Sequence, residues 1–282
     1  MAHAAPTPTR TEGMRGLKGK NVLVTGGSSG IGQAIAVRFA EYGANVAINY
    51  LTTPDEARDT GEQVHACVNR VRQEGVRDVL VQGDVSDEDD VVRMVGETAA
   101  ALGGVDVLIN NAGIQISRPS DELSAREFDK VLAVNLRGAF LCAREAIRHF
   151  LAEEKPGVIV NVSSVHQAIP KPDYLGYSCS KGGMMNLTRT LALEYAARGI
   201  RVNGLGPGAT ITPINSAWID DPVKKEQVES HIPMARAGTA DEMGGVACFL
   251  ASDDAAYITG QTLYVDGGLT LYPSFREPWS SE

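Results

Sequence analysis

Short apolar segments alternate with helix-patterned segments along almost the whole chain. The apolar segments predict buried strands at residues 20–25, 45–50, 78–82, 105–110, 157–162, 200–205 and 261–265. Helices are predicted between them, at about 30–43, 60–74, 87–102, 124–151, 174–198 and 239–251. Buried parallel strands need helices on both faces and right-handed crossovers. We therefore expect an α/β fold: a single doubly wound (Rossmann) domain with a seven-stranded parallel sheet.

No linker or shift in composition divides this alternating region, which predicts one domain over residues 18–272. Residues 1–17 are expected to form a flexible polar tail, and residues 273–282 a polar C-terminal extension. The longest stretch without a predicted strand, 209–235, is a candidate substrate lid because it follows the carboxyl end of a strand. Residues 52–64 are interpreted as an insertion after the second strand.

Charge and cysteine content exclude several classes of protein. The formal net charge of −9 argues against a nucleic-acid-binding surface, which needs clustered basic residues. The four cysteines lie far apart with no C-x-x-C or Cys/His spacing, so no metal site is expected. No run of 18 apolar residues predicts a membrane span, and no secretory signal is evident. We expect a cytoplasmic protein with a small-molecule substrate and no nucleic-acid or membrane partner.

A glycine-rich segment, TGGSSGIG, follows the first predicted strand and opens the first predicted helix. Gly26 permits a tight turn, Gly30 lets the backbone approach a pyrophosphate, and Gly32 permits close packing of helix on strand. Amide groups at the helix N-terminus favour an anion. The candidate cofactor-binding residues between these glycines are Ser28, Ser29 and Ile31. A glycine-rich turn that binds nothing is the alternative, which this strand–turn–helix context disfavours.

The end of the second strand, where a carboxylate would normally hold the adenosine ribose, carries Tyr50 and Leu51 instead. Neither an acidic nor a basic side chain stands there, so both NAD and NADP remain candidate cofactors. After the third strand, Asp84 and Val85 are candidates for contact with the adenine edge. Asp84 is equally well explained as a turn or helix-cap residue.

Tyr177 and Lys181 lie four residues apart, which places both on one face of a predicted helix. Ser164 ends the preceding strand and is expected to face the same crevice. A free tyrosine titrates near pH 10, and a neighbouring ammonium would lower the pKa of Tyr177. Tyr177 would then exchange a proton with an alcohol or carbonyl oxygen while Ser164 hydrogen-bonds to that oxygen. A surface Tyr–Lys pair without catalytic function is the alternative.

Six motifs occur in one order: TGGSSGIG, NNAG, Asn135 in VNLRG, Ser164 in NVSS, YSCSK and GPG. Together they resemble the short-chain dehydrogenase/reductase family over residues 18–272. The resemblance implies a catalytic tetrad of Asn135, Ser164, Tyr177 and Lys181, with Asn135 bending its helix and helping to hold a water, and with Lys181 also binding the nicotinamide ribose. It further implies cofactor contacts at Asn111, Ala112, Gly113, Pro207, Gly208, Ile211 and Thr212. A role of NNAG in stabilising the sheet is compatible with these contacts.

Motifs of the second half, such as SSVH, SKGGM and LYPSF, resemble the bacterial glucose 1-dehydrogenases within that family. This resemblance implies a homotetramer that oxidises β-D-glucose at C1 to the lactone with NAD or NADP. His166 and Asn215 match positions of the sugar pocket, and Gln115 stands where these enzymes commonly carry Glu. Leu51 stands where they commonly carry Arg.

Three other functions stay open at this point. A 3-oxoacyl or small-ketone reductase would use the same residues in the opposite direction. A non-catalytic nucleotide-binding sensor has no need of the Asn135, Ser164, Tyr177 and Lys181 set. A methyltransferase of similar topology would leave the Tyr–Lys pair unexplained.

Overall fold

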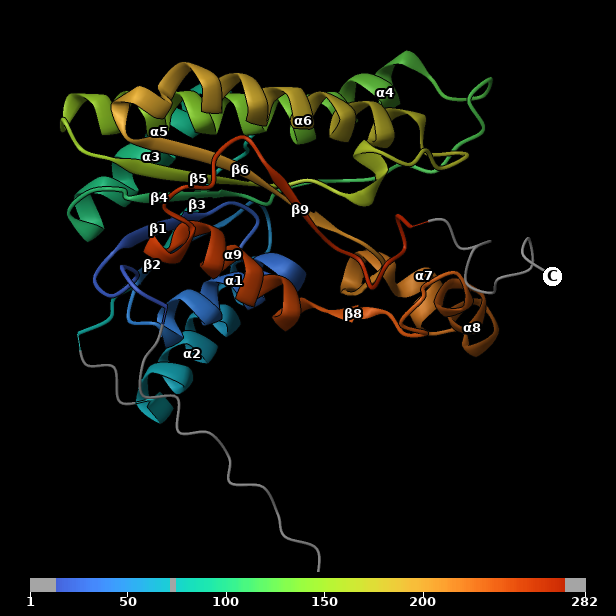
Figure 1. Ribbon diagram of the computed structural model, residues 1–282, viewed down its shortest axis with the longest axis horizontal. Coiled ribbons are helices and arrows are strands. Elements are labelled where there is room, and N and C mark those ends of the chain that lie inside the picture. The colour runs from blue at the N-terminus through green and yellow to red at the C-terminus, as the bar shows by residue number, and fades with distance from the viewer. Residues whose placement is uncertain (1–13, 72–74, 272–282) are drawn as a thin grey trace, which may run out of the picture.

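The computed structural model describes residues 14–71 and 75–271 and forms one parallel sheet with helices on both faces (Figure 1). The seven strands are β1 (Asn21–Val24), β2 (Asn45–Tyr50), β3 (Asp78–Gln82), β4 (Val107–Asn110), β5 (Gly157–Val162), β6 (Ile200–Pro207) and β9 (Thr262–Val265). All pairs are parallel, in the order β3-β2-β1-β4-β5-β6-β9. The strand order reverses between β1 and β4, where such folds place a ligand crevice. The predicted doubly wound, seven-stranded sheet is confirmed.

Two apolar cores lie on the two faces of this sheet. One face carries α1 (Gly30–Glu41), α2 (Pro54–Val71) and α9 (Ala240–Ala251), which lie together below the sheet in Figure 1. The other face carries α3 (Glu88–Leu102), α4 (Ala125–Leu132), α5 (Ala139–Ala152) and α6 (Leu175–Tyr195). Strand side chains alternate between the cores: Val22 and Val24 belong to the first and Leu23 to the second.

The region predicted as an insertion, 52–64, lies mostly inside a helix. Helix α2 begins at Pro54 rather than at the predicted residue 60. Proline suits the first turn of a helix, and Asp55 and Glu56 stabilise its positive end. Ala57, Thr60 and Val64 are fully buried on one face of the helix. The helix therefore starts six residues earlier than predicted, and most of the segment interpreted as an insertion packs against the sheet as its first turns.

The packed part of the chain also begins earlier than predicted. Leu17, assigned to the flexible tail 1–17, is fully buried in the core beneath α1 and α9. Arg15 forms an ion pair with Asp254, with Nε 2.6 Å from Oδ1. Residues 1–13 and 273–282 of the two predicted terminal segments lie outside the described residues.

The candidate lid, 209–235, projects beyond the carboxyl ends of β6 and β9 (Figure 1). It contains the short helices α7 (Ser216–Ile219) and α8 (Pro222–Ser230), neither of which has a buried residue. It also contains a two-residue strand that the sequence did not predict, β7 (Thr210–Ile211), which pairs in parallel with β8 (Gly238–Thr239). Among the described residues, no helix is both long and apolar enough to cross a membrane.

Candidate active site

A cavity of about 360 Å³ runs along the carboxyl ends of the central strands. Most of the predicted site residues line it: Gly26, Ser28, Ser29, Gly30, Ile31, Tyr50, Leu51, Asn111, Ala112, Gly113, Gln115, Ser164, Tyr177, Lys181, Pro207, Gly208, Thr212 and Asn215. The predicted residues outside its lining are Gly32, Asp84, Val85, Asn135, His166 and Ile211. One elongated cavity thus joins the glycine-rich loop to the Tyr–Lys pair.

The glycine-rich loop shapes one wall of this cavity. Gly26 and Gly30 have φ angles of +60° and +56°, which side chains of L-residues rarely adopt. A Cβ on Gly30 would lie 3.5 Å from Thr212 Cβ, in the space between the loop and the lid segment. A Cβ on Gly32 would collide with the carbonyl oxygen of Gly26. The bare backbone at the start of α1 therefore fits the pyrophosphate of a dinucleotide.

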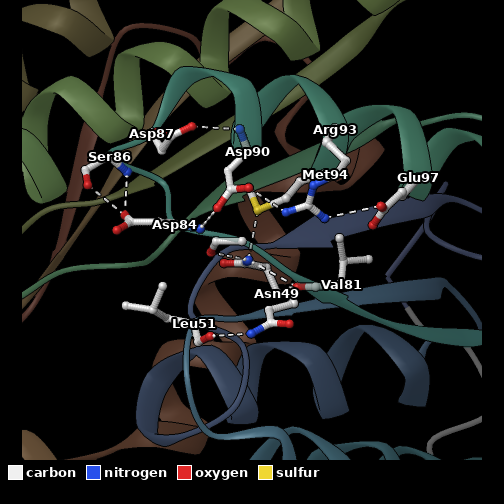
Figure 2. Close-up of polar contacts among 12 residues, drawn as sticks. Asn49, Leu51, Val81, Asp84, Ser86, Asp87, Asp90, Arg93, Met94 and Glu97 are labelled. Atoms are coloured by element: carbon white, nitrogen blue, oxygen red, sulfur yellow. Dashed lines mark hydrogen bonds and ion pairs between the residues drawn. The ribbon is translucent and has the colours of Figure 1, made fainter.

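Asn49, at the end of β2, hydrogen-bonds both to the glycine-rich loop and to the end of β3; Figure 2 shows its contacts on the β3 side. Its Oδ1 accepts a hydrogen bond from the Gly26 amide at 3.1 Å, and its Nδ2 lies 3.2 Å from Val81 O and 3.1 Å from Gly83 O. The side chain is 2 % exposed. Asn49 thereby connects the first turn of the loop to the end of β3. Its sequence signal is an amide that directly follows the apolar stretch Val46–Ile48 of β2.

Asp84 and Val85 have structural contacts that leave them outside the cavity. The Asp84 carboxylate accepts hydrogen bonds from the Ser86 amide at 2.8 Å and the Ser86 hydroxyl at 2.7 Å (Figure 2). Val85 is buried, and a Cβ on Gly138 would lie 2.9 Å from it. The turn interpretation of Asp84 accounts for its observed contacts, and the adenine contact remains a prediction.

The NNAG segment supports the centre of the sheet as well as lining the cavity. Asn111 Nδ2 lies 3.0 Å from the carbonyl oxygens of both Thr25 and Gly26. The Thr25 hydroxyl accepts from the amides of Asn111 and Ala112. These bonds connect the ends of β1 and β4 at the point where the strand order reverses.

At the other end of the cavity, Ser164, Tyr177 and Lys181 come together from β5 and α6. Lys181 is only 3 % exposed, and its Nζ donates to the Val162 carbonyl oxygen at 2.8 Å. The same Nζ lies 5.6 Å from the centre of the Tyr177 ring. Ser164 is buried at the end of β5 and hydrogen-bonds to the Tyr177 side chain. A hydroxyl, a phenol and an amine thus share one small site.

The protonation of this group differs from the sequence prediction. Burial raises the pKa of Tyr177 above its ordinary value, and the hydrogen bond with Ser164 offsets part of that rise. Burial also lowers the pKa of Lys181 to about 8. The amine is therefore largely neutral at the pH where Tyr177 ionises, so the predicted lowering of the Tyr177 pKa by a neighbouring ammonium is not seen. Tyr177 is therefore protonated at neutral pH, which suits proton donation to a carbonyl and makes alcohol oxidation faster as pH rises.

Asn135 lies in a π-helical turn, Ala133–Gly138, that interrupts the predicted helix 124–151 between α4 and α5. Its Oδ1 accepts from the Ile114 amide at 2.8 Å, and its Nδ2 lies 2.9 Å from Ile114 O and 3.0 Å from Ser180 Oγ. Ser180 Oγ in turn donates to the Tyr177 carbonyl oxygen. Wider turns of this kind are frequent at functional sites. Asn135 therefore connects NNAG with the Tyr–Lys helix from behind the cavity wall.

Besides Ser164 and Tyr177, the predicted substrate residues are His166, Gln115 and Asn215, and these three differ in their contacts. His166 stacks edge-on to Tyr177 at 6.2 Å, and its Nδ1 lies 3.0 Å from Ile169 O. Burial lowers the pKa of His166, so the ring is neutral at pH 7. The Gln115 amide donates to Ile214 O, and the Asn215 amide to Thr210 O. Both amides hold the lid segment, and each keeps its carbonyl oxygen for a ligand.

Several lining residues were not predicted from the sequence. They are Thr52, Thr53, Glu56, Val162, Ser163, Thr210, Pro213 and Ile214. The first three belong to the segment interpreted as an insertion, whose helical start was missed. The others lie within two residues of predicted ones, and only the three-dimensional course of the loops shows that they line the cavity.

Comparison with known proteins gives a consistent result. A family model described as "Enoyl-(Acyl carrier protein) reductase" matches residues 26–270. A glucose 1-dehydrogenase from Gluconobacter oxydans is 52% identical over 263 residues, covering 93% of this chain and 96% of that protein. A 3beta-hydroxysteroid dehydrogenase from Eggerthella lenta is 47% identical, covering 92% and 97% of the two chains.

A solved structure extends the likeness to three dimensions. A putative 2-deoxy-D-gluconate 3-dehydrogenase from Agrobacterium tumefaciens, with bound NADP, superposes with a TM-score of 0.81 at 32% identity. The match covers 91% of this chain and 98% of that one. The likeness in three dimensions therefore extends over nearly the whole chain.

Proposed function

This chain belongs to the short-chain dehydrogenase/reductase family, and we propose that it oxidises β-D-glucose at C1 to the 1,5-lactone. The protein is an NAD(P)-dependent oxidoreductase. A single observation carries the proposal: one cavity joins a bare glycine-rich loop to a buried Ser–Tyr–Lys group. Similarity to the Gluconobacter enzyme supports glucose in particular.

The residues of this chain divide the work between binding and proton transfer. The backbone of the loop from Gly26 to Gly32 would hold the pyrophosphate of a dinucleotide, and Lys181 would face its nicotinamide ribose. When bound, the dinucleotide would supply the hydride acceptor for the carbon being oxidised. Tyr177 takes the proton of the substrate hydroxyl, and Ser164 hydrogen-bonds to the same oxygen as its charge changes. Asn135 positions the Tyr–Lys helix through Ser180 and helps to hold a water.

The substrate end of the cavity suits a ligand rich in hydroxyl groups. Ser164, Gln115 and Asn215 present polar atoms there, and His166 lies against Tyr177. A sugar needs such donors and acceptors around it for orientation. Residues 209–235 form the lid over this end. They contribute Thr212 and Asn215 to the cavity wall.

The decisive test is an assay of the purified protein with β-D-glucose and each dinucleotide, following formation of reduced nicotinamide. We expect turnover with glucose well above that with other hexoses, secondary alcohols or a 3β-hydroxysteroid. If the protein shows no turnover with sugars but reduces ketones or 3-oxoacyl thioesters, the result would support the reductase alternative. Dinucleotide binding without turnover of any substrate would support a nucleotide sensor.

We also propose that the chain forms a homotetramer in the cytoplasm. Phe140 of α5 is 42% exposed and borders a shallow apolar hollow with Leu132, Leu136 and Leu187. Leu193, on α6 like Leu187, is 86% exposed. Exposed apolar surface of this kind often forms the interface between copies of a chain. Cys142 and Cys248 are buried as free thiols, which fits a reducing compartment. Light scattering with size exclusion tests the tetramer.

A further inference from the structure

We propose that Glu56, in the first turn of α2, makes this site select NAD over NADP. The inference rests on the proposed function only in that the cavity binds a dinucleotide. Sequence reasoning left the cofactor open because Tyr50 and Leu51 at the end of β2 are uncharged. The structure brings a carboxylate to that same end from a different element, the first turn of α2 within the segment interpreted as an insertion.

Contacts between α2 and the glycine-rich loop fix the position of Glu56. Thr60 is fully buried, with its Oγ1 3.2 Å from Ser28 O and 3.1 Å from Glu56 O. Gln33, on α1, donates to the same hydroxyl at 3.1 Å. Glu56 precedes Thr60 by four residues and therefore lies on the helix face that meets the loop. Its exposed side chain lines the cavity together with Leu51 and Ser28.

The charges around this end of the cavity are acidic. Glu56 also borders an adjoining groove that includes Asp55 and Asp59. Among the described residues that line the cavity and the groove, Lys181 is the only Lys or Arg, and it lies at the catalytic end. The nearest basic side chain on α2, Arg58, pairs with Asp55 at 2.5 Å.

A second cation on this side, Arg38 of α1, is also engaged. It is largely buried and forms ion pairs with Glu41 and Asp241. To meet a 2′-phosphate, Arg38 would have to leave largely buried ion pairs and Arg58 an exposed one. The first-turn acids also offset the positive end of α2, which would otherwise attract an anion.

The two cofactors respond oppositely to such a site. The adenosine ribose of NAD has a 2′-hydroxyl that donates a hydrogen bond to a carboxylate. The 2′-phosphate of NADP carries about two negative charges, which an unpaired carboxylate repels. Glu56 therefore binds one cofactor and rejects the other through the same oxygen atoms, as specificity by repulsion requires.

The test is equilibrium binding of NADH and NADPH, followed by nicotinamide fluorescence and independent of any substrate. We expect the unmodified protein to bind NADH at least about tenfold more tightly than NADPH at low salt. Glu56→Gln should reduce the preference for NADH over NADPH severalfold, mainly by tightening the binding of NADPH. Glu56→Lys should reduce that preference further. Glu62→Gln is the matched control, because this exposed glutamate of α2 lines neither hollow. It should leave the ratio unchanged.

Equal or tighter binding of NADPH by the unmodified protein would overturn the inference, as would a ratio that Glu56→Gln leaves unchanged. Both results would leave dinucleotide-dependent catalysis intact. Failure to bind either dinucleotide would overturn the inference together with the proposed function. Raising the salt concentration should weaken the discrimination, since the side chain is exposed.

Discussion

The two ends of the cavity are built in opposite ways. At the catalytic end, Ser164 and Lys181 are buried and Asn135 is fully enclosed, and each makes hydrogen bonds to neighbouring backbone or side chains. At the adenosine end, Leu51 is 51% exposed and the Glu56 side chain is also exposed to solvent. Proton transfer needs fixed geometry and controlled pKa values, whereas cofactor selection needs only a charge of the right sign. We therefore expect substitutions at the first end to abolish turnover and those at the second to alter affinity.

Tyr177→Phe should have the largest effect, because it removes the proton donor and acceptor and leaves the ring in place. Positioned proton transfer contributes about 10²- to 10⁴-fold, so we expect kcat to fall by about 10³-fold. The NADH dissociation constant should change by less than about twofold, since the fold and the loop are untouched. Tyr174→Phe, outside the cavity lining, serves as the control. Normal turnover by Tyr177→Phe would contradict the mechanism.

Lys181→Met should come next, with a loss of about 10²-fold in kcat and a distinctive effect on stability. The pKa of Lys181 is lowered from 10.5 to about 8, so the unfolded chain holds a proton that the folded one releases between these pH values. The free energy of unfolding of the parent protein should therefore gain roughly 3 kcal/mol from this group as pH rises from 8 to 10.5.

The variant lacks that gain. At pH 7 it should be at least as stable as the parent protein, because the cost of a buried charge is gone. The difference between the two should then shift in favour of the parent as pH rises. Urea unfolding at several pH values measures this directly. A constant difference across the range would show that the buried amine does not titrate there.

Asn135→Ala should reduce kcat by tens of fold and also destabilise the fold. The substitution leaves the Ile114 amide and carbonyl without their partner, a loss of about 1–3 kcal/mol. Ser180→Ala, which removes the next hydroxyl in the same chain of bonds, should reproduce part of the loss in kcat. An Asn135→Ala protein that loses stability while keeping full kcat would limit Asn135 to a structural role.

The sequence predicted the buried framework better than the charges around it. Strands such as 45–50 and 157–162 match because apolar runs and their neighbours determine them locally. The pKa of Tyr177 was predicted to fall, whereas burial raises it, because spacing on a helix does not reveal how deeply Tyr177 and Lys181 are buried. Glu56 was missed since its position depends on Thr60 reaching the loop, a contact between separate elements.

The smallest expected effect tests whether the glycine-rich loop, like the adenosine end of the cavity, controls cofactor affinity and not turnover. Asn49→Leu removes the hydrogen bond to the Gly26 amide, and we expect NADH to bind about tenfold more weakly with kcat at saturation unchanged. Asn45→Leu is the matched control: Asn45 lies four residues earlier on the same face of β2 and bonds to Asn21 and to the Arg77 amide. Both variants should lose similar stability, since both asparagines are buried. Only Asn49→Leu should weaken NADH binding, because only its partner belongs to the cavity. If both variants weakened NADH binding equally, NADH affinity would depend on the stability of the whole sheet. The glycine-rich loop would then not belong to a separate, affinity-determining end of the cavity.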